Sequence, residues 1–125
     1  PCVGTARVSL KRERAERAGR GGEEEAARWL EGEGWEIVAR RRKTPLGEID
    51  LIARREGLIA FVEVKWRRAV PDLDLAIDER RLARVAAAVG AVAHEYATGG
   101  EDIRIDVILL APGAEPRHIA NAWMP

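Results

Sequence analysis

Two runs of strand-forming residues, 48–54 and 58–66, lie close together in the middle of the chain, separated only by Arg55, Glu56 and Gly57. Runs rich in β-branched residues with so short a connection predict an antiparallel hairpin. Glu56-Gly57 suits a tight turn, because glycine reaches positive φ at little steric cost. We therefore expect a β-sheet that contains this hairpin.

The length of the turn decides which residues of the two strands face each other. If Glu56 and Gly57 form the turn, Asp50 lies across from Glu63 and Glu48 lies across from Lys65. A four-residue turn gives the same register, whereas a three-residue turn without a bulge mixes polar and apolar residues on one face, which burial disfavours. In the preferred register one face is wholly apolar, with Ile49, Leu51, Ala53, Ala60, Val62 and Val64. The other face is apolar at Ile52 and Phe61 and charged at Glu48, Asp50, Glu63 and Lys65.

The charged end of this face is a candidate metal site. Opposed residues in a hairpin lie about 4.5–5.5 Å apart between Cβ atoms, and two opposed carboxylates repel each other. Mg²⁺ or Mn²⁺ bound through oxygen offsets both charges. Lys65 can then orient a water molecule or stabilise charge that develops on a phosphate. Geometry alone leaves open a solvated ladder in which Lys65 pairs with Glu48 and Glu63.

The rest of the chain predicts an α/β protein. Before the hairpin we expect a helix over 23–33 and a half-buried strand over 35–42, with Trp35, Ile37 and Ala39 on one side. After it we expect a helix from Pro71-Asp72 with the apolar stripe Leu82, Val85, Val89, Val92 and Tyr96, a strand over 103–110 and an edge strand over 117–122. The order is helix, three strands, helix, strand, which predicts a mixed central sheet flanked by helices. Residues 1–20 are expected to form a basic arm, and 21–125 a single domain.

Charge is balanced overall and unevenly distributed. Lysine and arginine number 21, as do aspartate and glutamate, which argues against a protein that coats nucleic acid by bulk attraction. Local basic clusters are nevertheless predicted to hold phosphates: Arg40, Arg41, Arg42, Lys43, Arg67 and Arg68. A plain solvated surface is the alternative for both clusters. The single cysteine, Cys2, and the absence of a long apolar run predict a cytoplasmic protein without a membrane partner.

The spacing of the charged residues resembles a known nuclease motif. Asp50, twelve intervening residues and then Glu63-Val64-Lys65 resemble the PD-(D/E)xK signature of restriction-endonuclease-like nucleases, with Ile49 in place of the proline. A longer string resembles the YraN-like family of uncharacterised bacterial proteins, which is similar in turn to archaeal Holliday-junction resolvases. The string consists of Gly22-Glu23, Ala26-Ala27-Arg28-Trp29-Leu30, Gly34-Trp35, Gly47-Glu48-Ile49-Asp50-Leu51-Ile52-Ala53, Phe61-Val62-Glu63-Val64-Lys65 and Arg104-Ile105-Asp106-Val107.

This resemblance implies a restriction-endonuclease-like fold and a metal-dependent DNA endonuclease that acts on branched or otherwise structured DNA, as a homodimer. It implies that Asp50 and Glu63, with the carbonyl of Val64, bind Mg²⁺ or Mn²⁺ and that Lys65 is catalytic. Glu23 is implied to join the metal site, although an acidic first turn also favours the helix dipole. Glu48 is expected to hold Lys65 or an outer-sphere water.

Two other functions remain open from the sequence. One is a catalytically inactive nucleic-acid-binding protein that keeps the nuclease fold, and the other is a protein-interaction module whose carboxylates form a surface ladder. Two positions depart from the family pattern. Trp66 follows the catalytic lysine, and strand parity directs it toward the core, with a base-stacking platform as the alternative. The second helix offers Arg80 and Arg81 where the family often has a lysine.

Residues outside the motif are assigned structural roles. His94 and His118 are predicted to be non-catalytic, because neither has a partner at metal-ligand spacing. Arg104 and Asp106 are expected to form a structural ion pair with a neighbouring strand or helix.

Overall fold

The computed structural model describes residues 21–68 and 79–123. Its elements are a helix over residues 21–32, β1 (Glu36–Thr44), β2 (Gly47–Arg55), β3 (Leu58–Trp66), α2 (Glu79–Tyr96), β4 (Asp102–Leu110) and β5 (Arg117–Ile119). The predicted order is confirmed, and the last strand is shorter than expected. The basic arm over 1–20 and the predicted start of the second helix at Pro71-Asp72 lie outside the described residues.

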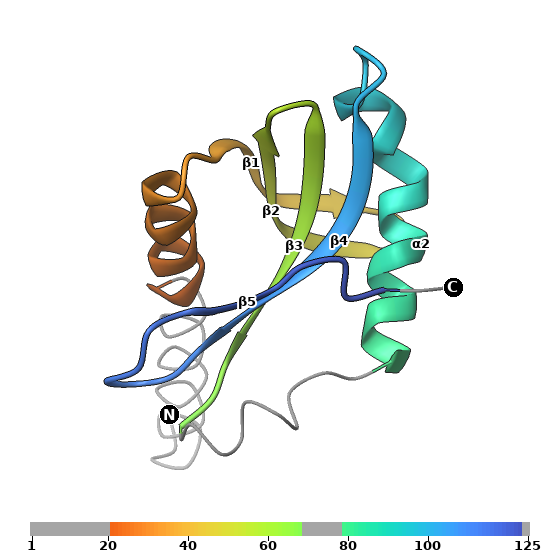
Figure 1. The fold of residues 1–125 in the computed structure, drawn as a ribbon. Coiled ribbons are helices and arrows are strands. Elements are labelled where there is room, and N and C mark those ends of the chain that lie inside the picture. The colour runs from red at the N-terminus through yellow and green to blue at the C-terminus, as the bar shows by residue number, and fades with distance from the viewer. Residues whose placement is uncertain (1–20, 69–78, 124–125) are drawn as a thin grey trace, which may run out of the picture.

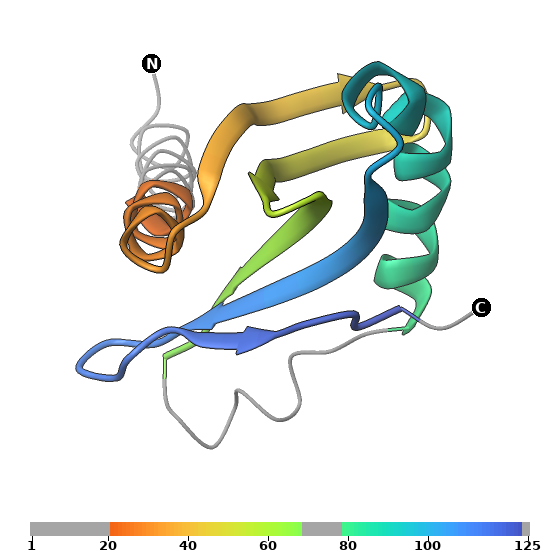
Figure 2. The same cartoon turned by 45° about the horizontal axis from the view of Figure 1, so that its top comes forward.

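The strands form one mixed sheet in the order β1-β2-β3-β4-β5. β3 and β4 are parallel, while the other neighbouring strands are antiparallel. Parallel neighbours need a crossover connection, and here the crossover carries α2. The first helix and α2 lie on opposite sides of the strongly twisted sheet (Figures 1 and 2). The predicted α/β class, a mixed sheet flanked by helices, is confirmed.

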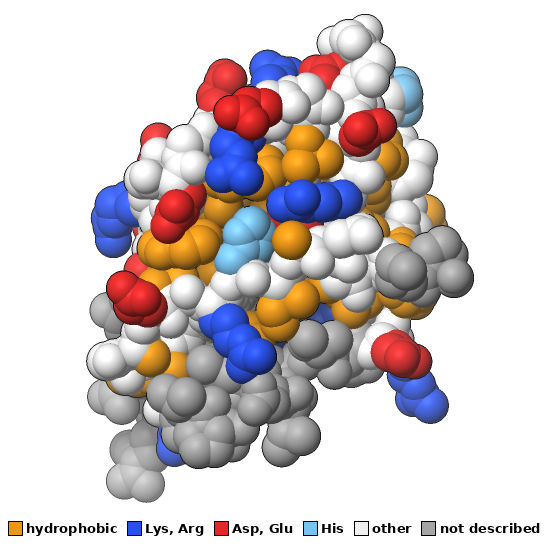
Figure 3. Space-filling view, viewed as in Figure 1, with side chains coloured by type: hydrophobic (Ala, Val, Ile, Leu, Met, Phe, Trp, Pro, Cys, Tyr) orange, Lys and Arg blue, Asp and Glu red, His pale blue; other side chains and the backbone are white. Residues whose placement is uncertain are grey.

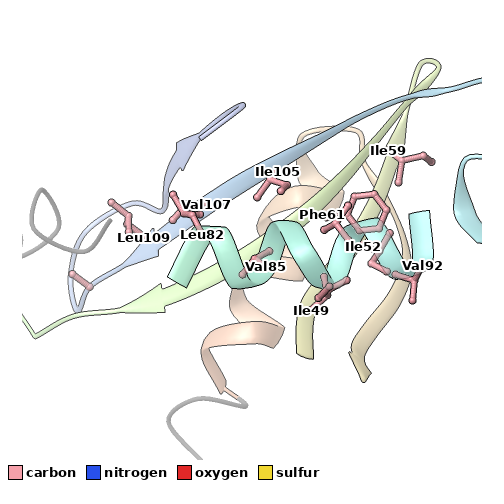
Figure 4. Close-up of a cluster of buried hydrophobic side chains, with 13 residues drawn as sticks. Ile49, Ile52, Ile59, Phe61, Leu82, Val85, Val92, Ile105, Val107 and Leu109 are labelled. Atoms are coloured by element: carbon pink, nitrogen blue, oxygen red, sulfur yellow. The ribbon is translucent and has the colours of Figure 1, made fainter. Parts of the chain in front are cut away.

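Each face of the sheet packs against one helix. The face toward α2 buries the predicted helix stripe, including Leu82, Val85 and Val92, against strand residues such as Phe61 (Figure 4). Tyr96, at the end of the stripe, is partly buried and meets the Phe61 ring edge-on, with 6.1 Å between ring centroids. The opposite face packs on the first helix through Ala26, Ala27, Leu30, Trp35, Leu51, Ala53, Ala60, Val62, Ile108 and Leu110.

The β2–β3 hairpin has the predicted register. Arg55 pairs with Leu58, and the pairing continues to Leu51 and Val62. The turn residues both have positive φ, 47° at Glu56 and 77° at Gly57. Such a turn matches the right-handed twist of the flanking strands, which explains why it fixes this register.

Two predicted side-chain directions are wrong. Ala39 was expected beside Trp35 and Ile37, but it packs in the cluster against α2. A register shift between Ile37 and Ala39 explains this, because an extra residue in one strand reverses the alternation of faces. Ile49 was expected beside Leu51, yet it also joins the α2 cluster (Figure 4).

Trp66 is also less buried than its strand parity predicted. It is the last residue of β3 and is 39% exposed. Parity indicates a side of the sheet but not the depth of cover, which is shallow at a strand end. None of the helices in the described ranges is long and apolar enough to span a membrane.

Candidate metal centre

Asp50 lies where β2 separates from β3. The pairing of the two strands ends at Leu51 and Val62, so the expected backbone pairing of Asp50 with Glu63 is not formed. Instead, Oδ2 of Asp50 accepts a hydrogen bond from the Val64 amide at 2.8 Å. The side chain of Asp50 thus takes the place of a backbone acceptor on β2, and it reaches toward β3 as the strands diverge.

Three carboxylates converge at this point. Glu23 comes from the first helix, and Glu48 and Asp50 come from β2, where alternate residues point to the same side. One oxygen from each lies within 4.8 Å of the others. From the sequence we expected Glu23 beside Asp50 and Glu48 only in an outer position. The structure places the carboxylate of Glu48 in the same group as those of Glu23 and Asp50.

Glu63 adjoins this group and is almost completely buried, with 2% of its surface exposed. Its Oε1 lies 3.3 Å from Nζ of Lys65 and 2.5 Å from Nε of Arg81. A buried carboxylate requires such partners, since an unpaired charge in the interior is very unfavourable. Arg81, in the first turns of α2, was not among the predicted site residues. Its position where the family often has a lysine was the signal that could have identified it.

The site perturbs the pKa values of two of its members. Burial raises the pKa of Asp50 to about 7, and the negative charge of Glu63 adds to the effect, while the Val64 amide opposes it. Burial also lowers the pKa of Lys65, although Glu63 opposes that change. Both shifts favour the neutral forms, because burial removes the two groups from water.

Arg41 connects β1 to the carboxylate group through an unusual backbone conformation. Its φ of 51° lies in the left-handed region, which costs free energy for a residue other than glycine. Its Nε binds Oε2 of Glu23 at 2.6 Å. The hydrogen bond from Arg41 thus offsets one of the three converging negative charges.

The predicted phosphate-binding residues are placed differently from one another. Three of them form ion pairs with glutamates. Arg40 binds Glu24 at 3.0 Å, and Arg41 binds Glu23 at 2.6 Å. Arg42 binds Glu95 at 2.8 Å. Lys43 and Arg68 are exposed, and Arg67 donates to the Trp66 carbonyl. These ion pairs offset the positive charges of Arg40, Arg41 and Arg42 locally. The binding of phosphate by these six residues stays a prediction.

The donor set fits a hard divalent cation. Glu23, Glu48 and Asp50 offer only oxygen atoms, which Mg²⁺ and Mn²⁺ accept and which soft metals do not prefer. Glu63 lies near enough for its negative charge to raise the pKa of Asp50. Metal binding by the Val64 carbonyl remains a prediction. In the structure the backbone amide of Val64 donates a hydrogen bond to Asp50.

A second charged cluster lies apart from these residues, on β4 and β5. Asp106 is fully buried and accepts hydrogen bonds from Arg104, from the Asn121 amide and from Nε2 of His118, the last at 2.7 Å. The His118 ring also meets Trp29 edge-on. Arg104 and Asp106 were expected to pair with a neighbouring strand or helix, but they pair with each other on β4, and the contact with the neighbouring strand is the one between Asp106 and His118 of β5. The cluster fastens β5 to the sheet.

The fold and this site define an α/β protein with a candidate divalent-cation centre between a helix and a diverging hairpin. The chain belongs to the uncharacterised protein family UPF0102, whose model matches residues 22–110. It is 66% identical to a UPF0102 protein of Erythrobacter litoralis and 53% identical to one of Sphingopyxis alaskensis, each time over 93% of this chain and 100% of the relative. It is 44% identical to the UPF0102 protein RPA0323 of Rhodopseudomonas palustris, over 91% of this chain and 88% of the relative. The predicted membership of an uncharacterised bacterial family is confirmed, and the matched range includes every carboxylate of the site.

Proposed function

We propose that this protein is a metal-dependent DNA endonuclease that hydrolyses phosphodiester bonds in branched or otherwise structured DNA. The observation that carries the proposal is the convergence of Glu23, Glu48 and Asp50 to within 4.8 Å beside Lys65 and Glu63. The Asp50–Glu63–Lys65 spacing that resembles the nuclease signature supports the same function.

The converging carboxylates repel one another, and a bound cation would remove this electrostatic cost. Like charges in a partly desolvated site repel each other, and the raised pKa of Asp50 expresses that repulsion together with burial. A divalent cation held by Glu23, Glu48 and Asp50 would favour their ionised forms. When bound there, Mg²⁺ or Mn²⁺ supplies Lewis-acid activation of a scissile phosphate and of an attacking water.

The chain's own cations act beside that centre. Only 14% of the Lys65 side chain is exposed, and its ammonium group pairs with Glu63, so this group has a fixed position. A lysine in this place donates hydrogen bonds to phosphate oxygen atoms as negative charge develops on them. Arg81 binds the same oxygen of Glu63, Oε1, and its side chain remains half exposed, so it can also meet a phosphate.

The surface around the site supports a structured substrate. On the face seen in Figure 3, which β4 and β5 cross, acidic and basic side chains are interspersed, so no broad positive surface attracts DNA there. At the site itself, Lys43 and Arg68 are exposed near the ends of β1 and β3 and offer local contacts to phosphates. Trp66, beside Lys65, is exposed enough to stack on an unpaired base. Action as a homodimer is part of the same proposal, because a symmetric junction presents two equivalent cleavage positions.

Cleavage of labelled DNAs by the full chain tests the proposal. Linear duplex, single-stranded, flapped and four-way-junction substrates of shared sequence would be incubated with Mn²⁺, with Mg²⁺ and with chelator. We expect metal-dependent cleavage that Lys65→Ala abolishes and that Arg28→Ala, which removes an exposed positive charge from the first helix, leaves intact. Binding without cleavage of any substrate would instead favour an inactive nucleic-acid-binding protein.

A further inference from the structure

The turn between β1 and β2 presents an apolar side chain beside the carboxylate site. Among the described residues, the large hydrophobic side chains exposed to solvent are Leu46, Trp66 and Ile103. Leu46 is the most exposed of these, at 56%. A single exposed leucine is ordinary on a protein surface, so its surroundings decide whether it has a use.

The surroundings of Leu46 are those of the proposed active site. A small cavity of about 130 Å³ is lined by Leu46, Gly47, Glu48, Glu63, Arg81, Arg84 and Val85. Glu48 belongs to the converging carboxylates, and Glu63 is held by Lys65 and Arg81. The leucine therefore lies at the rim of a cavity whose other walls carry the charged groups of the site.

The turn holds Leu46 in place. The hydroxyl of Thr44 accepts a hydrogen bond from the Leu46 amide at 3.1 Å and donates one to the Gly47 carbonyl at 2.8 Å. Pro45 fixes one backbone dihedral between them. Gly47, with a φ of 142°, supplies a conformation that side chains rarely allow. A turn whose backbone is already ordered loses little conformational entropy when its side chain enters a partner.

We propose that Leu46 is a wedge that enters the base stack of DNA where the stack is interrupted, and so selects branched over continuous duplex substrates. This inference rests on the proposed function. Leucine is one of the side chains that proteins insert between base steps, and unstacking costs least where a base has already lost a neighbour. The arginines on the same cavity, Arg81 and Arg84, lie where they would meet the adjoining phosphates.

Two variants separate this role from a general effect on folding. Leu46→Ala removes the wedge from an exposed turn without emptying a core position. Ile103→Ala is the matched control, because Ile103 is also exposed, at 47%, but lies on β4 outside the cavity that Leu46 lines. Leu46→Met keeps an apolar side chain of similar size and should restore the function.

The measurement has a binding arm and a cleavage arm. In the binding arm, Ca²⁺ replaces Mn²⁺ and a fluorescent 2-aminopurine is placed at the branch point, where its emission rises on unstacking. In the cleavage arm, the rate with Mn²⁺ on a four-way junction is divided by the rate on a linear duplex of the same sequence. We expect Leu46→Ala to abolish the fluorescence rise and to lower the rate ratio about tenfold, which corresponds to ~1.4 kcal/mol. Leu46→Met and Ile103→Ala should behave as the wild type.

The possible outcomes distinguish the wedge from the nuclease. An unchanged fluorescence rise and rate ratio in Leu46→Ala, with an active wild type, would overturn the wedge and leave the nuclease standing. A rise that depends on Leu46 in a protein that cuts no DNA would support the wedge and contradict the nuclease. A wild type that neither cuts DNA nor changes the fluorescence would overturn both.

Discussion

Replacing Asp50 by asparagine should stabilise the protein in the absence of metal, although it removes a residue of the proposed active site. Asn keeps an oxygen that can accept the hydrogen bond from the Val64 amide. It removes the negative charge that burial and Glu63 disfavour. The folded protein therefore loses an unfavourable interaction and keeps the contact that ties β2 to β3.

The size and pH dependence of this gain follow from the pKa of Asp50. A rise from 3.8 to about 7, at ~1.4 kcal/mol for each tenfold change in proton affinity, corresponds to about 4 kcal/mol if all of it opposed folding. Asp50 is partly solvated, and its ion-paired neighbours can adjust, so we expect a gain of about 2 kcal/mol. Because the folded-state pKa is raised, the unfavourable contribution is absent below pH 3.8, grows as the pH rises and is complete above about 7.

Thermal unfolding in chelator measures this gain. At pH 8 the Tm of Asp50→Asn should exceed that of the wild type by about 5–10 °C, and near pH 4 the two should nearly coincide. Asp102→Asn, at an exposed position at the start of β4, is the control and should change Tm little at either pH. A variant that is less stable than the wild type at pH 8, or a difference that does not grow with pH, would refute the reasoning.

Three further changes test other parts of the structure by urea denaturation. Arg81→Ala should destabilise the metal-free protein by about 1 kcal/mol, because it leaves the buried Glu63 with one fewer cation; the effect is modest because Arg81 is half exposed. No loss of stability would indicate that Lys65 alone is enough to neutralise Glu63. Asp106→Asn should cost about 3 kcal/mol, because it breaks a fully buried cluster; a loss below 1 kcal/mol would show that the cluster does not fasten β5. Glu56→Asn should stabilise by about 0.5 kcal/mol, because Asn tolerates the positive φ of that turn better; a loss would mean that Glu56 has a role beyond the turn.

Much of the fold could be predicted because local residues determine it. Glu56-Gly57 specifies a turn with two positive φ values, and that turn fixes the β2–β3 register. The stripe from Leu82 to Val92 has the period of a helix with one buried side, which is how α2 packs. The prediction of a central mixed sheet followed from the order of such segments.

The wrong predictions concern features that alternation cannot encode. The register shift before Ala39 inserts a residue without any glycine or proline to announce it. The positive φ of Arg41 is likewise held by surrounding structure. Trp66 shows that parity does not predict how deeply a side chain is buried, because burial depends on what covers the strand end.

The site was predictable in part for the same reason. Asp50, Glu63 and Lys65 share a hairpin, so its turn brings their strands together, although the pairing of the strands ends at Leu51 and Val62, before it reaches these residues. Glu48 was predicted to lie near Asp50, but its closeness to Glu23 depends on how the first helix lies over the sheet. Arg81 reaches Glu63 through the packing of α2, which no local pattern specifies.

Calorimetric titration of the chelator-treated protein with Mn²⁺ tests most directly that the carboxylate group is a divalent-cation centre. At pH 7.5 we expect saturable binding that Glu48→Gln weakens by at least about tenfold and that Glu115→Gln, at an exposed position after β4, leaves unchanged. The affinity should fall as the pH is lowered below about 7, because Asp50 must release its proton to bind a cation. Equal binding by the wild type and Glu48→Gln, or no saturable binding by the wild type, would contradict the account.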